Sequence, residues 1–263
     1  MGPLRKYYPL FLLGWIASVV VSCSPSQEQY FARSTELAAV VFATQTAEEK
    51  LRSTATPTPI PTPALPPTRT PIYPSGWPVI FFDTFSSNLN DWPMGTETNE
   101  YVENHWSFAG GKYRWEVNAI QDVHWYVTPN IKSVSDFYLS ADLQRISGPE
   151  DCSYGLVFRV QDDRNFYLFL ISDTQYYSIY RIYNGVWDTL VDWKYLSSII
   201  PGGINRVSVT AQSTNFDFWV NDQQTESIYD PIIENGKVGV TMILHRAGDQ
   251  AIFEFDNFEV REP

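Results

Sequence analysis

The segment Ser153–Trp187, SYGLVFRVQDDRNFYLFLISDTQYYSIYRIYNGVW, contains successive runs that are rich in aromatic and β-branched residues. Short polar turns separate the runs, which are Tyr154–Gln161, Asn165–Ile171, Tyr176–Tyr183 and a fourth that follows Asn184-Gly185. Aromatic and β-branched residues favour strands. Asn-Gly favours a type I′ turn, because both central residues of that turn need positive φ. The segment therefore predicts an antiparallel meander.

Similar runs recur on both sides of the meander, and no long segment with helical periodicity interrupts them. Turn-forming pairs such as Gly110-Gly111, Asn221-Asp222 and Asn235-Gly236 separate them. Many short strands with turns at near-regular spacing predict an all-β sandwich or barrel. The remaining expected strands are Val79–Phe85, Lys112–Val117, Val123–Val127, Phe137–Ile146, Val186–Trp193, Arg206–Ala211, Phe216–Val220, Lys237–Leu244 and Ala251–Val260.

The order of side chains along the meander predicts which face of it is buried, because successive residues of a strand point to opposite sides. In the first run, the expected core face comprises Tyr154, Leu156, Phe158 and Val160, and the opposite face Gly155, Val157, Arg159 and Gln161. In the second run, we expect Phe166, Leu168 and Leu170 in the core and Tyr167, Phe169 and Ile171 on the opposite face. That opposite face would be mixed aromatic and polar, and in a curved two-sheet sandwich it would be the concave surface of one sheet.

Residues 1–22 are typical of an export signal. Arg5 and Lys6 precede an apolar run, Leu10–Ser22, that is too short for a comfortable membrane span. The run ends in VVS before Cys23, which resembles the bacterial lipobox. The resemblance implies cleavage before Cys23 and a diacylglycerol group on its sulfur, and two or more acyl chains give stable anchoring. We expect an exported protein that is lipid-anchored to the membrane and faces the extracytoplasmic side; a conventionally cleaved or uncleaved signal is the alternative.

Three regions follow the signal. Residues 23–53 are compatible with a membrane-proximal stalk that is in part helical. Residues 54–75 are rich in Thr and Pro, and Thr-Pro repeats favour extended polyproline II, which predicts a semi-rigid linker. Residues 76–263 contain all the strand-like runs and are enough for a domain with its own core.

The acidic charge of the chain is concentrated in the predicted domain. The whole chain has a net charge of −12, and residues 76–263 contain 12 Lys and Arg against 26 Asp and Glu. Such a domain is poorly suited to nucleic acid, whose phosphates are neutralised by Lys and Arg. Neutral ligands or cations suit its field better. Cys23 and Cys152 are the only cysteines, too few for a disulfide framework, and Cys152 is expected to be a small unpaired side chain in the domain.

Several segments together resemble a known superfamily. They are FFDTFSSNLNDW, FAGGKYRWEV, SYGLVFRVQDDRNFYLFLI, YNGVWDTLVDW, PGGINRVSV, FDFWVNDQ and FDNFEV, and they span residues 80–260. The pattern resembles the concanavalin A-like lectin/glucanase domains, close to the laminin G-like and 3-keto-disaccharide hydrolase-like groups. The resemblance implies a jelly-roll sandwich of two antiparallel sheets, with glycan contacts on the concave side or the rim. Members include glycosidases and non-catalytic binding modules.

One carboxylate trio fits a spacing used for catalysis in this superfamily. Glycosidases need two carboxylates across the scissile bond, and Glu254, Asp256 and Glu259 match the bulged E-x-D-x-x-E spacing of glycoside hydrolase family 16. That family places the motif in the middle of the chain, whereas here it lies in the terminal strand. We therefore expect a closing edge strand with solvated Glu254 and Glu259, and assign no catalytic residue.

A structural calcium ion is a second implication of the resemblance, although no cofactor is required. In related jelly rolls an aspartate of the last strand helps to bind calcium near the first strands, and the matching positions are Asp83, the carbonyl of Gly110 or Gly111, and Asp256. Calcium prefers several oxygen ligands of this kind. The alternative is that Asp256 is a hydrogen-bonding residue at the end of a strand.

The remaining candidates form an aromatic and polar platform. Sugars stack their C–H faces on aromatic rings while nearby polar groups bind their hydroxyls. The candidate ligand-binding residues are Trp125, Tyr126, Arg159, Gln161, Tyr167, Tyr177 and Trp187. The leading hypothesis is a surface-anchored, non-catalytic module that binds a glycan or polysaccharide. The alternatives are a saccharide-acting hydrolase or lyase, tested at Asp163 and Glu254, and a structural or protein-binding sandwich.

Overall fold

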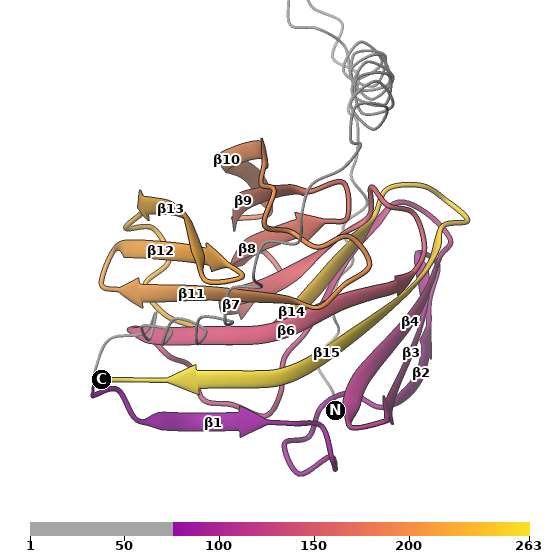
Figure 1. Ribbon diagram of the computed structural model, residues 1–263, viewed down its shortest axis with the longest axis horizontal. Coiled ribbons are helices and arrows are strands. Elements are labelled where there is room, and N and C mark those ends of the chain that lie inside the picture. Colours follow the sequence, from indigo (N-terminus) through magenta and orange to yellow (C-terminus); the bar gives the residue numbers. More distant parts are fainter. Residues whose placement is uncertain (1–75) are drawn as a thin grey trace, which may run out of the picture. The chain divides into compact units, whose positions relative to one another are not determined.

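A computed structural model of the chain describes residues 76–263, and in them it contains strands and no helix (Figure 1). This part of the chain thus has no helix long and apolar enough to cross a bilayer. The strands are β1 (Val79–Asp83), β2 (Gly95–Thr98), β3 (Val102–Ala109), β4 (Lys112–Ala119), β5 (Val123–Val127), β6 (Phe137–Ser147), β7 (Ser153–Asp162), β8 (Asn165–Ser172), β9 (Tyr176–Tyr183), β10 (Val186–Tyr195), β11 (Asn205–Gln212), β12 (Asn215–Val220), β13 (Gln223–Tyr229), β14 (Lys237–Leu244) and β15 (Gln250–Arg261).

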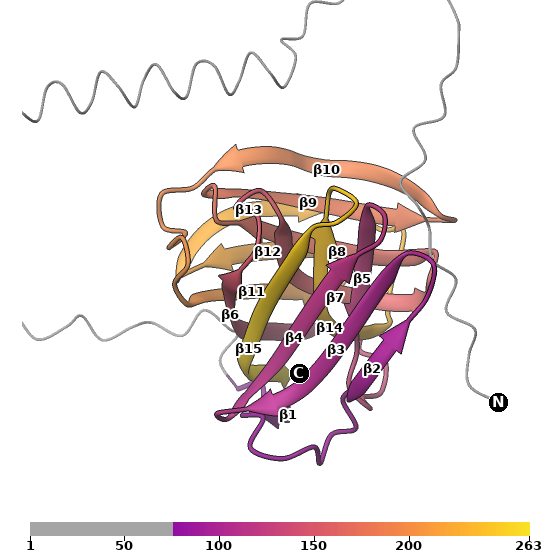
Figure 2. The same ribbon diagram turned by 90° about the vertical axis from the view of Figure 1, so that its right-hand side faces the viewer.

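The strands form two antiparallel sheets packed face to face, so the predicted jelly-roll sandwich is confirmed. The nine-stranded sheet has the order β13-β12-β11-β6-β15-β4-β3-β2, with β1 paired to β15. The six-stranded sheet has the order β10-β9-β8-β7-β14-β5. In Figure 2 the strands β15, β4, β3 and β2 lie next to one another and form one wing of the larger sheet.

Three of the fifteen strands, β2, β3 and β13, were not predicted. The segments of β2 and β13, GTET and QQTESIY, are polar because they lie at the two edges of the nine-stranded sheet. In β3 every second residue from Val102 to Trp106 points inward, as is usual in a strand. One of these inward residues is Asn104, which is fully buried and accepts a hydrogen bond from Trp115 Nε1 at 2.9 Å. A polar residue at an inward position interrupts the apolar pattern by which such a strand is detected.

The main core lies between the sheets and is rich in aromatic rings. Trp92, Tyr113 and Phe85 are buried and pack with ring centroids 5.2–5.5 Å apart. Asp83 fixes the turn after β1 over this cluster, since its carboxylate accepts hydrogen bonds from Phe85 N at 2.7 Å and Trp92 Nε1 at 2.9 Å. Fully burying an apolar side chain such as that of Phe85 contributes about 1.5–3 kcal/mol to the stability of the fold.

The predicted faces of β8 are reversed in the structure. Tyr167, Phe169 and Ile171 point into the main core, whereas Phe166, Leu168 and Leu170 lie on the outer face of the six-stranded sheet. The pairing with β7 explains this, because residues that face each other across an antiparallel pair share a side of the sheet. The pairs are Tyr154 with Ile171, Leu156 with Phe169 and Phe158 with Tyr167. Every residue of β8 after Asn165 is buried, so the hydrophobic pattern did not distinguish its two faces.

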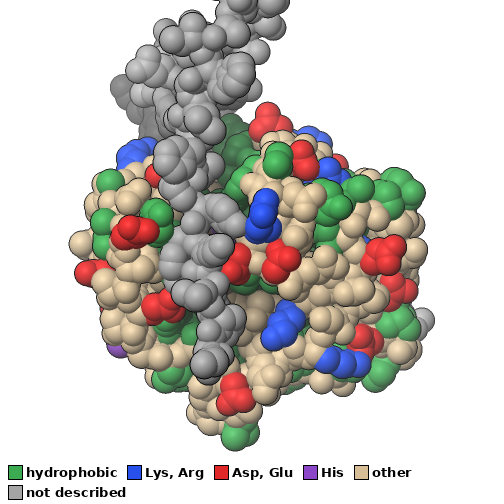
Figure 3. Space-filling view, turned by 180° about the vertical axis from the view of Figure 1, so that it is seen from behind, with side chains coloured by type: hydrophobic (Ala, Val, Ile, Leu, Met, Phe, Trp, Pro, Cys, Tyr) green, Lys and Arg blue, Asp and Glu red, His purple; other side chains and the backbone are tan. Residues whose placement is uncertain are grey.

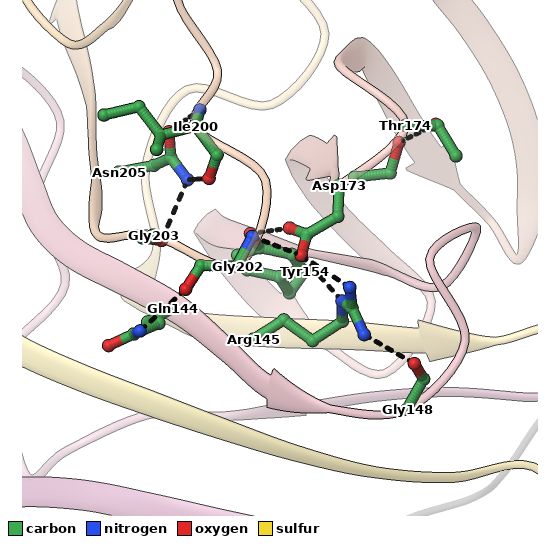
Figure 4. A network of polar contacts seen from close by, with 11 residues as sticks. Gln144, Arg145, Gly148, Tyr154, Asp173, Thr174, Ile200, Gly202, Gly203 and Asn205 are labelled. Atoms are coloured by element: carbon green, nitrogen blue, oxygen red, sulfur yellow. Dashed lines mark hydrogen bonds and ion pairs between the residues drawn. The ribbon is translucent and has the colours of Figure 1, made fainter.

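A polar network around Asp173 ties the two sheets together at one end of the sandwich (Figure 4). Asp173 follows β8, and its buried carboxylate accepts hydrogen bonds from Tyr154 Oη and Gly202 N, both at 2.7 Å. Arg145 of β6 pairs with it at 2.8 Å through both Nε and Nη2. Because Arg145 belongs to the nine-stranded sheet and Tyr154 to the six-stranded sheet, the carboxylate joins the two layers.

Candidate functional site

The structure does not gather the predicted ligand-binding residues on one surface. Trp125, Tyr167 and Tyr177 are part of the main core and are 0–4% exposed. The hydroxyl of Tyr167 donates to Asp230 Oδ1 at 2.9 Å, and that of Tyr177 to Glu226 Oε1 at 2.8 Å. These three rings therefore cannot line an open face, and their place in the platform was wrong.

Arg159 lies inside the domain and is 1% exposed. Its φ is +50°, and the register of β7 shifts at this point against both β8 and β14. This bulge reverses the alternation, because the extra residue moves the following side chains to the other face. The guanidinium group enters the interior and donates to the carbonyl oxygens of Ser135 (3.0 Å), Ser213 (2.6 Å) and Ile233 (2.6 Å). Arg159 thus joins three loops and is not a surface residue, contrary to the prediction.

The other two aromatic candidates, Tyr126 and Trp187, lie on the outer face of the six-stranded sheet. They pack against a second cluster of buried apolar side chains, together with Tyr180 and Trp193. The cluster itself comprises Val157, Val160, Phe166, Leu168, Leu170, Ile182 and Ile243. This face is therefore a second apolar cluster with an aromatic border, and not the mixed polar and aromatic surface that was predicted. Gln161, at the end of β7, is exposed to solvent.

The six-stranded sheet curls strongly around this cluster. Strands β5 and β10 are its two edges, and in a flat sheet five spacings of about 4.8 Å would put them about 24 Å apart. Yet the ring of His124 on β5 is 5.3 Å from that of Trp187 on β10, measured between centroids. His124 also stacks on Phe166 at 5.4 Å. The outer face of the sheet is thus concave, and we call the rings His124, Tyr126, Tyr180, Trp187 and Trp193 the aromatic border.

Two polar contacts hold the aromatic border in place. The hydroxyl of Tyr126 donates to Asp163 Oδ1 at 2.7 Å, in the turn between β7 and β8. His124 Nε2 lies 2.9 Å from Thr241 Oγ1 on β14. Burial lowers the pKa of His124 to about 3, so the imidazole is neutral at physiological pH. His124 shares a face with Tyr126 in the alternating segment Val123–Val127, and this alternation could have revealed it in the sequence.

The trio on β15 lies on one face of the nine-stranded sheet, as its bulged spacing requires. Glu254, Asp256 and Glu259 are half-buried, and the register shifts between Asp256 and Glu259. Strand β15 is central in the sheet, so the prediction of an edge strand with solvated carboxylates was wrong. Glu254 pairs with Lys112 at 2.9 Å and Arg114 at 2.8 Å, and Glu259 pairs with Arg206 and Arg261.

The positions considered for calcium have other partners. Both oxygens of Asp83 accept N–H donors, and Asn90 Nδ2 adds a third at 2.8 Å to those of Phe85 and Trp92. Asp256 Oδ1 accepts from Asn257 N at 2.7 Å, and burial raises the pKa of Asp256. Gly110 lies in the turn between β3 and β4 with a φ of +61°. Within residues 76–263 no three His, Cys, Asp or Glu side chains are grouped as metal ligands. Calcium binding stays a prediction.

A separate cavity of about 260 Å³ opens on the outer face of the wing. Its lining follows two neighbouring rows across the strands: Thr96, His105, Glu116, Ile252 and Ser147 in one, and Glu103, Asn118 and Gln250 in the other. We call this cavity the polar hollow. The hollow was not predicted, because the sequence did not reveal two of its strands, β2 and β3.

Comparison with solved structures supports the architecture. Similar structures include a GlcNAcα1-4Gal releasing endo-β-galactosidase from Clostridium perfringens (11% identity, TM-score 0.52, covering 74% of this chain and 65% of that one). A protein of unknown function with galectin-like fold from Bacillus subtilis is also similar (12% identity, TM-score 0.50, covering 70% of this chain and 95% of that one). So is the GH43 protein BlXynB from Bacillus licheniformis (14% identity, TM-score 0.50, covering 68% of this chain and 39% of that one). The chain has the concanavalin A-like fold. No family model and no curated protein sequence matches it.

Within this concanavalin A-like sandwich, the two candidate sites lie on different sheets. The concave face belongs to the six-stranded sheet and the polar hollow to the nine-stranded sheet. Seen from behind, the described surface has acidic and basic side chains interspersed with apolar ones (Figure 3). No extended basic patch is visible on the described part of that side.

Proposed function

We propose that the domain binds saccharides on the concave face of the six-stranded sheet. The observation that supports this most is the curl of the sheet, which brings rings from its two edge strands, His124 and Trp187, to 5.3 Å across a concave face. Tyr180 extends the border, with its ring 5.7 Å from that of Trp187. A concave, mostly apolar surface with a few fixed polar groups is the usual form of a small-molecule site.

The chemistry of the aromatic border suits a sugar. The C–H faces of a pyranose can stack on the indole of Trp187 and the phenol of Tyr126, and both rings are half-buried. Asp163 accepts the Tyr126 hydroxyl and so fixes the orientation of this ring. His124 is neutral, and the aromatic border contains no Lys or Arg. The site would therefore prefer neutral saccharides to acidic ones.

We infer binding without catalysis. The general acid of a glycosidase must hold its proton at neutral pH, which takes a water-excluded, apolar environment. Glu254 and Glu259 are instead each paired with two cationic side chains, so neither carboxylate lies in an apolar environment. Hydrolysis by the β15 trio is the second candidate, because Glu254, Asp256 and Glu259 do share one face of the sheet.

We further propose that the domain is displayed outside the cell on the Thr/Pro linker, anchored through a lipid on Cys23. These residues lie outside the described part of the chain, so the support is the sequence of residues 1–75 alone. Mass spectrometry of the mature amino terminus tests this, and an unmodified Cys23 would refute it.

Affinity electrophoresis through gels that contain neutral polysaccharides tests the binding function. We expect retardation of the isolated domain, and Trp187→Ala to weaken binding about tenfold, which corresponds to about 1.4 kcal/mol and lies near the value of one aromatic stacking contact. Tyr229→Ala is the matched control, because Tyr229 is a tyrosine that is 70% exposed on the edge strand β13. Equal retardation of Trp187→Ala and the native domain would exclude the concave face. Release of reducing ends that Glu254→Gln abolishes would show an enzyme.

A further inference from the structure

The polar hollow is unrelated to the concave face and has a chemistry of its own. We propose that it is a second binding site, and that it takes a saccharide that bears a protonated amine, such as an amino sugar. The proposal does not depend on the function assigned to the concave face, since the two sites share no residue.

The charges of the hollow favour a cation. Its only charged lining residues are Glu103 and Glu116, and no Lys or Arg lines it. Arg114 Nε lies 3.0 Å from one oxygen of Glu116, whose side chain is 45% exposed. Among the described residues Glu103 pairs with no cation, and its contact is the amide of Asn118 at 3.3 Å. An ammonium group between these carboxylates would gain charge-assisted hydrogen bonds.

The spacing of the two carboxylates suits one small cationic group. Glu103 faces Asn118 and Glu116 faces His105 in the β3–β4 pair. The two glutamates are therefore diagonal neighbours, whose Cα atoms lie about 7–8 Å apart on such a pair. Flexible Glu side chains can close this separation from both sides, so one ammonium group could contact both carboxylates.

The rest of the lining suits a polyol. Thr96, Ser147, Asn118 and Gln250 offer donors and acceptors in two adjacent rows, and Thr96 Oγ1 already lies 3.0 Å from His105 Nδ1. Ile252, beside Glu116 in the first row, adds an apolar side chain to the lining for the C–H face of a ring.

Size favours a small saccharide over a basic peptide. The volume of about 260 Å³ is close to the lower end for small-molecule sites, about 300 Å³. Peptide-binding surfaces depend on Trp, Tyr or large apolar anchors. The hollow has Ile252 and Val117 but no Trp, Tyr or Phe in its lining.

Isothermal titration of residues 76–263 at pH 6 tests the proposal, because the amino groups of the probe are mostly protonated at that pH. The probes are β-1,4-linked oligomers of glucosamine, of N-acetylglucosamine and of glucose, and a glucuronate oligomer. We expect the glucosamine oligomer to bind about fivefold more tightly than its N-acetylated form. This ratio corresponds to the upper end of the free energy that one exposed ion pair contributes. This preference should decrease in about 0.5 M salt, because the electrostatic screening length, about 10 Å at 0.1 M, is shorter at higher ionic strength.

Variants connect the preference to the hollow. Glu103→Gln and Glu116→Gln should each reduce it at least twofold, whereas Glu234→Gln, an exposed glutamate in the loop before β14, removes the same charge elsewhere and should leave it unchanged. Equal binding of the amine and N-acetyl oligomers, or a preference that survives both substitutions, would overturn the proposal. Tighter binding of an oligolysine that displaces the glucosamine oligomer would also overturn it in favour of a basic peptide. A thermal melt of each variant shows whether it is folded.

Discussion

Replacement of Arg159 tests whether this residue supports the fold or binds a ligand. In Arg159→Met the carbonyl oxygens of Ser135, Ser213 and Ile233 lose their donors, and the ring of Phe216 loses a guanidinium group 4.5 Å from its centroid. Leaving a buried polar group unsatisfied costs about 1–3 kcal/mol, and the lost cation–π contact up to about 2 kcal/mol.

The free energy gained by no longer burying the guanidinium group opposes these losses. Burial already lowers the pKa of Arg159, and the effective penalty for burying one ion is several kcal/mol. We therefore expect a net decrease of about 3–5 kcal/mol in the free energy of unfolding, similar to the removal of one partner from a buried ion pair. For a domain of this size that is a decrease of about 6–20 °C in Tm.

Urea denaturation followed by tryptophan fluorescence measures this change. Arg164→Met is the matched control, because the Arg164 guanidinium group donates to Asn184 O at the surface and its loss should cost less than about 1 kcal/mol. Arg159→Lys keeps the charge but not the planar fork, so we expect an intermediate value. A native-like denaturation midpoint for Arg159→Met, combined with loss of saccharide binding, would refute the reasoning and return Arg159 to the ligand site.

Four further perturbations address other parts of the structure. The pKa of His124 is lowered to about 3 in the folded state, against about 6.5 in the unfolded state, so its contribution to stability is present above pH 6.5 and is lost as the pH falls. From pH 7 to pH 5 the free energy of unfolding should decrease by about 2 kcal/mol. The variant His124→Gln should remove this part of the pH dependence in urea titrations. Asp173→Asn should destabilise the domain by about 3–5 kcal/mol in the same assay, since Arg145 would lose its buried partner, and a smaller loss than 1 kcal/mol would contradict the role of this network. Gly236→Ala should lower the free energy of unfolding by about 1–3 kcal/mol, because the added Cβ would lie 2.3 Å from the Arg159 carbonyl carbon. An unchanged denaturation midpoint would mean that the bulge at Arg159 can move. Chelation with EDTA should leave Tm unchanged, as the oxygens of Asp83 accept three N–H donors, and a decrease in Tm would instead support calcium.

The fold was predictable because most strands carry local signals. The segments Val123–Val127, Tyr176–Tyr183 and Lys237–Leu244 were predicted with the bounds that the structure has. The orientation of β8 was not predictable from its own residues, since nearly every position in it is buried and apolar. Its orientation is set by the register with β7, which is a property of the pair and not of either strand.

The candidate sites were less predictable for two physical reasons. The bulge at Arg159 requires positive φ in a residue that rarely adopts it, and no turn-forming residue marks the position. The curl of the six-stranded sheet brings His124 and Trp187 together over 63 positions of sequence, which no local pattern reports. Tyr126 and Trp187 were identified as aromatic candidates from their residue type, but their neighbours depend on this curvature.

The pairing of β1 with the end of β15 determines how the sandwich would respond to a pulling force. A force applied to the chain ahead of Gly76 reaches the domain first through β1, which is aligned with β15 at Val79–Arg261, Phe81–Val260, Phe82–Glu259 and Asp83–Phe258. Pulled along its length, β1 would load these contacts together in shear, not one after another. Beyond them, Asp83 passes the load to the buried Trp92. Strand β15 lies between β4 and β6, so the tension would be distributed into the centre of the larger sheet.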